Sequence, residues 1–194
     1  MIYNKYVIRC LIKGGKTMSN ITYVVGDLFQ APQGFCLAHC ISADFVLGAG
    51  IAVQFNKKFN MKERLKDQWG NSEVQIGDVI KIDNVYNLIT KEHSYEKPTY
   101  DSLQKAVQTM IDLMKDDGVK KVAMPKIGAG LDRLKWNVVL AIIKDAFEKT
   151  DIEVVIYFLP NDNDFPNANN DSYISYDKDE DVRCNKGYMD DYIF

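Results

Sequence analysis

The sequence contains little cysteine and histidine and no long hydrophobic run. Its four cysteines, at positions 10, 36, 40 and 184, are too few and too scattered for a disulfide framework. We therefore expect a reducing, cytoplasmic setting. No apolar run approaches the roughly 18 residues that a membrane span requires, so we expect no membrane contact. The composition, 46% hydrophobic and 26% charged over 194 residues, is typical of an ordinary globular protein.

The scarcity of histidine also argues against a metal site. Cys36, His39 and Cys40 are close in sequence, but they lie in an apolar run, and His93 is the only other histidine. A structural zinc ion requires four ligands, and no second Cys/His pair exists to supply them. We predict no metal and no other cofactor.

The net charge of -3 is unevenly distributed. Residues 1–17 hold four basic and no acidic side chains, whereas residues 161–194 hold nine acidic and three basic ones. Residues 1–17 do not resemble a signal peptide, because a long apolar segment and a cleavage site are missing. We hypothesise instead that Met18 is the natural start, preceded by a translated ribosome-binding site at residues 13–15, and that the source is bacterial or phage. The acidic tail is expected to be disordered or loosely docked, and its aromatic residues leave a partner-binding role open.

Strand and helix patterns alternate between residues 18 and 160. Apolar residues at helical spacing predict three helices, one following Gly50, one ending near Asp117 and one over residues 136–147. The alternation predicts helices on both faces of a mostly parallel sheet. Short β-branched and apolar runs predict strands at 21–25, 34–42, 77–82, 86–90, 121–125 and 152–159, the third and fourth joined as a possible hairpin at 83–84.

Two loops with the sequence Gly-Ala-Gly, at residues 48–50 and 128–130, each separate a predicted strand from a predicted helix. Backbone N–H groups exposed at such a turn, together with the following helix N-terminus, favour phosphate oxygens. One such turn is usually only a tight connection, but two at equivalent positions could hold a diphosphate. Neither loop has the P-loop lysine or the Gly-x-Gly-x-x-Gly spacing, which disfavours kinase and Rossmann folds.

Three charged residues follow strands or the second glycine loop. Asp27 and Asp132 could simply cap a turn or helix, and Lys91 could be an ordinary solvated lysine. However, ligands in open α/β folds bind outside the carboxyl ends of the strands, where these residues are expected. There a lysine could attack an electrophilic sugar carbon while a carboxylate moves the proton. Asp27 could accept a hydrogen bond from an amino group such as adenine N6.

Six segments in order resemble the macrodomain family. The resemblance spans about residues 20–159 and is strongest to the terminal ADP-ribose protein glycohydrolase branch, which includes antitoxin macrodomains that reverse DNA ADP-ribosylation. It implies a three-layer α/β/α sandwich with a mixed central sheet and a cleft for ADP-ribose. We assign this domain to residues 18–160, between a leader (1–17) and a tail (161–194). The segments are 22–29 (TYVVGDLF), 37–42 (LAHCIS), 48–53 (GAGIAV), 88–91 (LITK), 97–100 (KPTY) and 124–136 (MPKIGAGLDRLKW).

The resemblance also implies roles for individual residues. Lys91 would be the nucleophile, forming a covalent lysyl–ADP-ribose at the distal ribose, and Asp132 the general acid or base. Asp27 would hold the adenine amino group, helped by the backbone of the adjacent Leu28. Ser42 would lie near the distal ribose and Leu159 near the adenine. The other expected substrate-binding residues belong to the two glycine loops: Gly48, Ala49, Gly50, Ile51, Ala52, Lys126, Ile127, Gly128, Ala129, Gly130 and Leu131.

Because both catalytic residue types are present, we predict an enzyme, a hydrolase that removes ADP-ribose from a protein carboxylate ester or a DNA base. The alternatives are an ADP-ribose 1''-phosphate phosphatase and a non-catalytic ADP-ribose reader. The expected partners are ADP-ribose and an ADP-ribosylated macromolecule, and the protein is expected to be a monomer. DNA is expected only as a modified substrate, since the acidic tail would repel a duplex.

The chain departs from the family pattern in two places. It continues for 34 residues beyond Pro160, which affects the expected Leu159 contact and access to the cleft. Lys91 is followed by Glu92 and His93, where relatives tend to be basic, and this local charge change could alter the choice of substrate.

Overall fold

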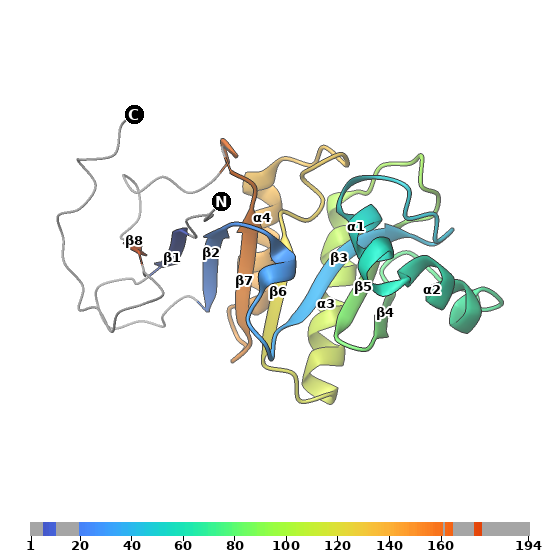
Figure 1. Ribbon diagram of the computed structural model, residues 1–194, viewed down its shortest axis with the longest axis horizontal. Coiled ribbons are helices and arrows are strands. Elements are labelled where there is room, and N and C mark those ends of the chain that lie inside the picture. The colour runs from blue at the N-terminus through green and yellow to red at the C-terminus, as the bar shows by residue number, and fades with distance from the viewer. Residues whose placement is uncertain (1–5, 11–19, 161, 165–172, 176–194) are drawn as a thin grey trace.

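The computed structural model describes residues 6–10, 20–160, 162–164 and 173–175. These residues form one mixed sheet with helices on both faces, as Figure 1 shows. The strands are β1 (Tyr6–Cys10), β2 (Ile21–Val25), β3 (Cys36–Ser42), β4 (Val79–Ile82), β5 (Val85–Lys91), β6 (Lys121–Pro125), β7 (Glu153–Phe158) and β8 (Tyr173–Ser175). The helices are the short 3₁₀ helix η1 (Leu28–Gln30), α1 (Gly50–Phe59), α2 (Met61–Trp69), α3 (Tyr100–Asp116) and α4 (Trp136–Phe147).

The strand order is β4-β5-β3-β6-β7-β2-β1-β8. The central strands β5, β3, β6, β7 and β2 are all parallel, and β4 pairs with β5 as the hairpin predicted at residues 83–84. At the other side β1 pairs antiparallel with β2, and β8 with β1. The expected leader and tail therefore each contribute a strand, while Met18 and most of the tail lie outside the described residues.

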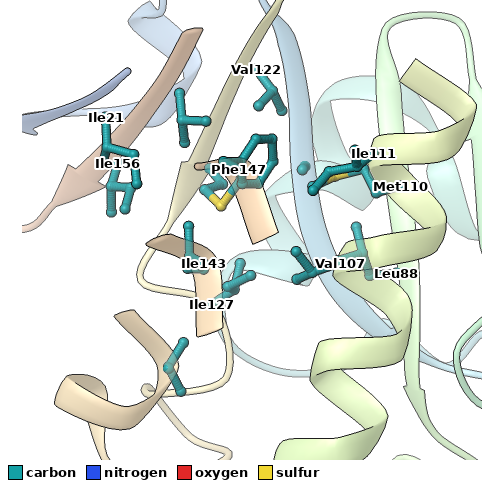
Figure 2. Packing of buried hydrophobic residues seen from close by; sticks show 14 of the residues in the cluster. Ile21, Leu88, Val107, Met110, Ile111, Val122, Ile127, Ile143, Phe147 and Ile156 are labelled. Carbon is teal, nitrogen blue, oxygen red and sulfur yellow. The ribbon is translucent and has the colours of Figure 1, made fainter. Parts of the chain in front are cut away.

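The sheet separates two hydrophobic clusters, which confirms the predicted three-layer sandwich with a mixed central sheet. One cluster packs α3 and α4 against one face, and Figure 2 shows Met110 and Ile111 of α3 and Phe147 of α4 within it. The other cluster packs α1 and α2 against the opposite face. Neighbouring residues on one strand enter different clusters, as Leu88 and Ile89 do, because side chains alternate along a strand.

Helix α2 was not predicted from the sequence. It follows α1 directly through Asn60, whose φ of 50° turns the chain between the two helices. Its only buried residues are Met61 and Leu65, one helical turn apart. Two apolar positions are too few to produce a recognisable period. By contrast, α3 has six buried positions and ends at Asp116, in agreement with the prediction.

The three residues considered as metal ligands do not share one environment. His39 stacks on Phe55 with ring centroids 3.7 Å apart and is hydrogen-bonded to Asn87 at 2.8 Å. Cys36 and Cys40 pack against the cluster on the opposite face of the sheet. The described residues contain no group of three metal-binding side chains. Within the same part of the chain, no helix is long and apolar enough to cross a membrane.

The buried His39 makes a prediction about stability. Burial lowers its pKa from 6.5 to about 4, although the hydrogen bond with Asn87 acts in the opposite direction. The unfolded chain binds the proton near pH 6.5 and the folded chain does not, so stability falls as the pH falls from 6.5 towards 4. We expect His39 to lower the free energy of unfolding by about 2–3 kcal/mol between neutral pH and pH 4.

Urea unfolding of His39→Gln at both pH values measures this contribution, because glutamine removes the titrating group and keeps a polar side chain. The variant should lose less stability on acidification than the wild type. His93→Gln, at a half-exposed histidine, is the matched control. Equal acid sensitivity of the wild type and His39→Gln would show that His39 contributes nothing to it.

Candidate active site

The five parallel strands end at one edge of the sheet, and the loops that follow them gather there (Figure 1). In open α/β folds this is the edge outside which ligands bind. Every site residue predicted from the sequence lies at one of these strand ends, in a loop that follows it, or in the first turn of η1 or α1. The topology therefore brings together segments that are far apart in the sequence.

Lys91 and Asp132 form a shielded ion pair at this edge. Lys91 is the last residue of β5 and pairs with Ser42 of β3. Its Nζ lies 2.7 Å from Oδ1 of Asp132, and the two side chains are only 14% and 19% exposed. The predicted nucleophile and the predicted proton carrier are therefore in direct hydrogen-bond contact, as nucleophilic catalysis requires.

The loop at residues 126–135, which carries this aspartate, is anchored from two sides. Lys97 Nζ donates to the carbonyl oxygen of Leu131 at 2.6 Å. The backbone N–H of Lys135 donates to the hydroxyl oxygen of Tyr100 at 3.1 Å. Lys97 and Tyr100 both belong to the KPTY segment, one of the six segments that resemble the macrodomain family. Their hydrogen bonds connect this loop to the beginning of α3. They fix the position of the carboxylate relative to Lys91.

The two glycine loops lie against each other. A Cβ on Gly50, where φ is 58°, would lie 3.5 Å from Cδ1 of Leu131 in the other loop. Gly128 also has a positive φ, of 67°, and a Cβ there would come within 3.1 Å of the Leu134 side chain. Helix α1 begins at Gly50, and its N-cap residue Ala49 makes no side-chain hydrogen bond. The first N–H groups of α1 thus remain available for an anion such as a diphosphate.

The loop at residues 43–49 holds two bulky residues in the left-handed region. Phe45 and Leu47 have φ values of 50° and 47°, and both side chains are buried. Such conformations cost about 1–3 kcal/mol each and persist where packing enforces them. Burial of the two side chains fixes the path of the chain from Ser42 to the first glycine loop.

The other end of the edge carries Asp27, Leu28 and Leu159, which the sequence predicted to bind adenine. Asp27 caps η1 by accepting a hydrogen bond from the N–H of Phe29 through Oδ1, at 3.0 Å, and is otherwise exposed. Leu28 is buried beside it, whereas Leu159, just past β7, is 73% exposed. Burial raises the pKa of Tyr157, and the nearby Asp27 charge adds to the effect, so the phenol stays neutral. This part of the edge therefore combines a hydrogen-bond acceptor, the carboxylate of Asp27, with the exposed apolar side chain of Leu159.

Lys126 lies at the same edge, but its ammonium group is already paired. Nζ contacts Asp162 at 2.7 Å and Asp164 at 2.7 Å, and the Lys126 side chain is 15% exposed. Burial lowers the pKa of Lys126, but the hydrogen bonds with the two carboxylates outweigh burial and raise it. The lysine that we predicted to bind substrate is thus neutralised by the segment following β7.

Cys40 of β3 is an alternative nucleophile that interacts electrostatically with Lys91 and Asp132. Burial raises the pKa of its thiol to about 12, and the negative charge of Asp132 contributes to the rise. A cysteine with this pKa remains a thiol at neutral pH and is a poor nucleophile. The lysine is therefore the better candidate for nucleophilic attack at this site.

Several contacts at the site were not predicted from the sequence. They involve Asp44, whose carboxylate links the loops after β3 and β5, and the pairing of Lys126 with Asp162 and Asp164. The acids 162 and 164 belong to a polar segment without any periodicity, so no local signal could reveal their partner. Lys97 was noted as part of a motif, but without a role.

Comparison with known proteins supports the same interpretation of the chain. The model of the Macro domain family matches residues 37–143. The human protein named ADP-ribose glycohydrolase OARD1 is 49% identical over 144 residues, which are 73% of this chain and 93% of that protein. The protein named DNA ADP-ribosyl glycohydrolase of Thermus aquaticus is 26% identical over 148 residues, which are 71% of this chain and 41% of that protein.

Among solved structures, the macrodomain of Mycobacterium tuberculosis DarG is similar with a TM-score of 0.66 and 27% identity, covering 71% of this chain and 96% of that one. The resemblance seen in the six sequence segments is thereby confirmed over nearly the whole core. The chain belongs to the macrodomain family.

Proposed function

We propose that this protein is a hydrolase that binds ADP-ribose and removes it from modified macromolecules. The observation that carries the proposal is the ion pair of Lys91 and Asp132, placed at the ligand-binding edge beside two glycine loops. The names of the relatives, an ADP-ribose glycohydrolase and a DNA ADP-ribosyl glycohydrolase, support the same reaction. A module that only binds ADP-ribose would not need a nucleophile and a proton carrier in contact.

In the proposed orientation the diphosphate lies between the N–H groups of residues 48–52 and the loop at 126–132. The adenine amino group donates to the free oxygen of Asp27, next to the backbone of Leu28 and the side chain of Leu159. The distal ribose then lies near Ser42 and Lys91, with its anomeric carbon, C1'', facing the lysine.

The proposed reaction proceeds in two steps. Lys91 first transfers a proton to Asp132, and the free amine attacks C1''. The bond from C1'' to the ester oxygen breaks, and the carboxylate of the acceptor leaves with the electron pair and takes the proton from Asp132. A water molecule then gives a proton to Asp132 and adds to C1'' while the C1''–N bond breaks with its electron pair going to nitrogen, which releases ADP-ribose. Asp132 finally returns the proton to the free amine, which restores the ion pair. The covalent lysyl–ADP-ribose between the steps is part of the proposal.

Three substrates separate this proposal from its alternatives. The protein is incubated with an ADP-ribosylated protein, an ADP-ribosylated DNA and ADP-ribose 1''-phosphate, and release of ADP-ribose or phosphate is followed. We expect ADP-ribose release from at least one of the two macromolecules. Phosphate release alone would identify a phosphatase. Binding of ADP-ribose without any release would identify a reader.

Asp27→Ala should weaken binding of free ADP-ribose. The substitution removes the acceptor proposed for the adenine amino group, and the loss should be about 1–3 kcal/mol, the usual cost of leaving a buried polar group unpaired. Isothermal titration calorimetry measures it. Asp27 also caps η1, so Asp27→Asn, which keeps an oxygen for the N–H of Phe29, serves as the structural control. Unchanged affinity of both variants for ADP-ribose would refute the adenine assignment.

The proposal also covers the extent of the catalytic unit, its oligomeric state and its cofactor requirement. The catalytic unit comprises residues 18–160, acts as a monomer and uses no cofactor. A reducing cytoplasmic setting agrees with Cys36 and Cys40, which are free thiols. A bacterial or phage source stays a prediction that rests on the proposed start at Met18.

A further inference from the structure

The loop that follows the proposed nucleophile has a fixed conformation. The N–H of Ser94 donates to Oδ2 of Asp44 at 2.7 Å, and the N–H of His93 donates to Glu96 at 3.0 Å. Lys97 holds the end of the loop on the carbonyl group of Leu131. Residues 92–97 are therefore bound to other segments at two points and braced by one internal hydrogen bond, so their exposed side chains project from a preorganised surface.

This loop exposes an aromatic pair within four residues of Lys91. Tyr95 is 80% exposed, and its ring stacks on His93 with centroids 5.2 Å apart and an interplanar angle of 17°. The side chain of Glu92 beside them is 68% exposed. A rigid aromatic pair with a neighbouring carboxylate, open to solvent, is suited to contact a cationic group.

A cavity of about 550 Å³, also lined by Asp44, lies between the loop after β3 and the end of α2. Its lining includes the half-exposed indole of Trp69 and the carboxylates of Asp44 and Glu73, together with one lysine, Lys66. The cavity adjoins the catalytic strand, because the N–H of Ala43 donates to the carbonyl oxygen of Lys91 at 3.0 Å.

The charge of Asp44 is maintained by its hydrogen bonds. Burial raises the pKa of this carboxyl group, but hydrogen bonds from Ser42, Ser94 and Val46 outweigh burial and hold the pKa below its ordinary value. Asp44 thus contributes a stable negative charge to the surface shared by loop and cavity. That surface carries two lysines, Lys66 and Lys97, and the ammonium group of Lys97 is bound to a backbone carbonyl oxygen. It also carries four carboxylates, those of Asp44, Glu73, Glu92 and Glu96.

We propose that this surface, formed by Asp44, Trp69, Glu73, Glu92 and Tyr95, binds the acceptor protein through a lysine or arginine side chain that flanks the ADP-ribosylated residue. The inference rests on the proposed function, since it concerns the part of the substrate that leaves. A carboxylate pair next to an indole is suited to a cationic side chain. The same excess of negative charge opposes a nucleic acid backbone, which would have to approach these carboxylates.

Peptides that carry one ADP-ribosylated glutamate, flanked by lysine and arginine or by serine and glycine, test the proposal. With the wild type, we expect the basic flanks to lower KM by about 3- to 10-fold at unchanged kcat, as expected for contacts outside the reacting centre. Trp69→Ala and Glu73→Lys should remove this preference without changing the affinity for free ADP-ribose. Glu148→Lys, the same charge change in an exposed residue after α4, is the matched control and should retain the preference.

Three results would overturn the inference. These are a wild type indifferent to the flanks, variants that raise KM equally for both peptides, and a preference for an ADP-ribosylated single-stranded oligonucleotide that Trp69→Ala abolishes. If the wild type releases no ADP-ribose from any peptide, the proposed function fails instead. Equilibrium binding of the same two peptides, measured by fluorescence anisotropy, then decides the inference independently of turnover.

Discussion

Lys91→Ala should lose at least about 1,000-fold in the rate of ADP-ribose release, because it removes the nucleophile of the proposed covalent step. Binding of free ADP-ribose should change little, since the proposed diphosphate and adenine contacts come from other residues. Single-turnover release from an ADP-ribosylated protein measures the first quantity, and calorimetry with ADP-ribose the second. A large loss of rate at retained affinity would distinguish catalysis from binding.

The substitution leaves Asp132 as a largely shielded carboxylate without its partner, which can lower stability. Lys91→Gln keeps a hydrogen-bond donor towards Asp132 and should be equally inactive while unfolding at a temperature closer to the wild type. Lys120→Ala provides a matched control. Lys120 directly precedes β6, at the opposite edge of the sheet, and forms an exposed ion pair with Asp151 at 2.8 Å. Full turnover by both Lys91 variants would refute the covalent mechanism. Phosphate release as the sole remaining activity would favour the phosphatase alternative.

Asp132→Asn should slow turnover by about 100- to 10,000-fold, the usual contribution of a general acid or base. Asparagine retains an oxygen that can accept the hydrogen bond from Lys91 but cannot take up a proton. In mildly alkaline buffer the solvent can accept the Lys91 proton in place of Asp132, and the carboxylate of the acceptor needs little protonation to leave. Under that condition, formation of the adduct should suffer less than its hydrolysis. The variant should therefore show a burst of acceptor release followed by very slow release of ADP-ribose.

Rapid-quench measurements that follow the freed acceptor and free ADP-ribose separately would detect this difference. Asp151→Asn, which alters the exposed pair at the opposite edge, should behave as the wild type. Equal slowing of both products in Asp132→Asn would place its role in the first step. No slowing of either product would remove Asp132 from the mechanism.

Much of the fold could be predicted because the residues that form apolar patterns in the sequence are also the residues buried in the folded protein. The strands β2 and β6 and the helix α4 have the boundaries that their apolar patterns predicted. The strands each contain a short run of buried residues, and the buried residues of α4 recur at helical spacing. Lys91 and Asp132 could be placed at the same edge of the sheet because each follows a strand that was predicted to be parallel, and β3 does pair in parallel with β5 and β6. What the pattern could not supply was their contact distance, which depends on how the loop at 126–135 is anchored.

The parts that escaped prediction depend on contacts between distant segments. Asp162 and Asp164 belong to a polar segment, and only the folded chain brings them to Lys126. The cavity beside Trp69 forms between α2, which was not predicted, and the loop after β3. The left-handed conformations of Phe45 and Leu47 are enforced by burial rather than by residue type, since bulky side chains disfavour them.

The central claim is that Lys91 becomes covalently attached to ADP-ribose during turnover, and mass spectrometry of the quenched enzyme tests it most directly. Asp132→Asn is mixed with an ADP-ribosylated protein, quenched within the burst, digested and analysed for modified peptides. We predict an ADP-ribosyl group on the peptide that contains Lys91, and its absence when Lys91 is also replaced by alanine. A burst of acceptor release with an unmodified Lys91, or with the group on another residue, would contradict it.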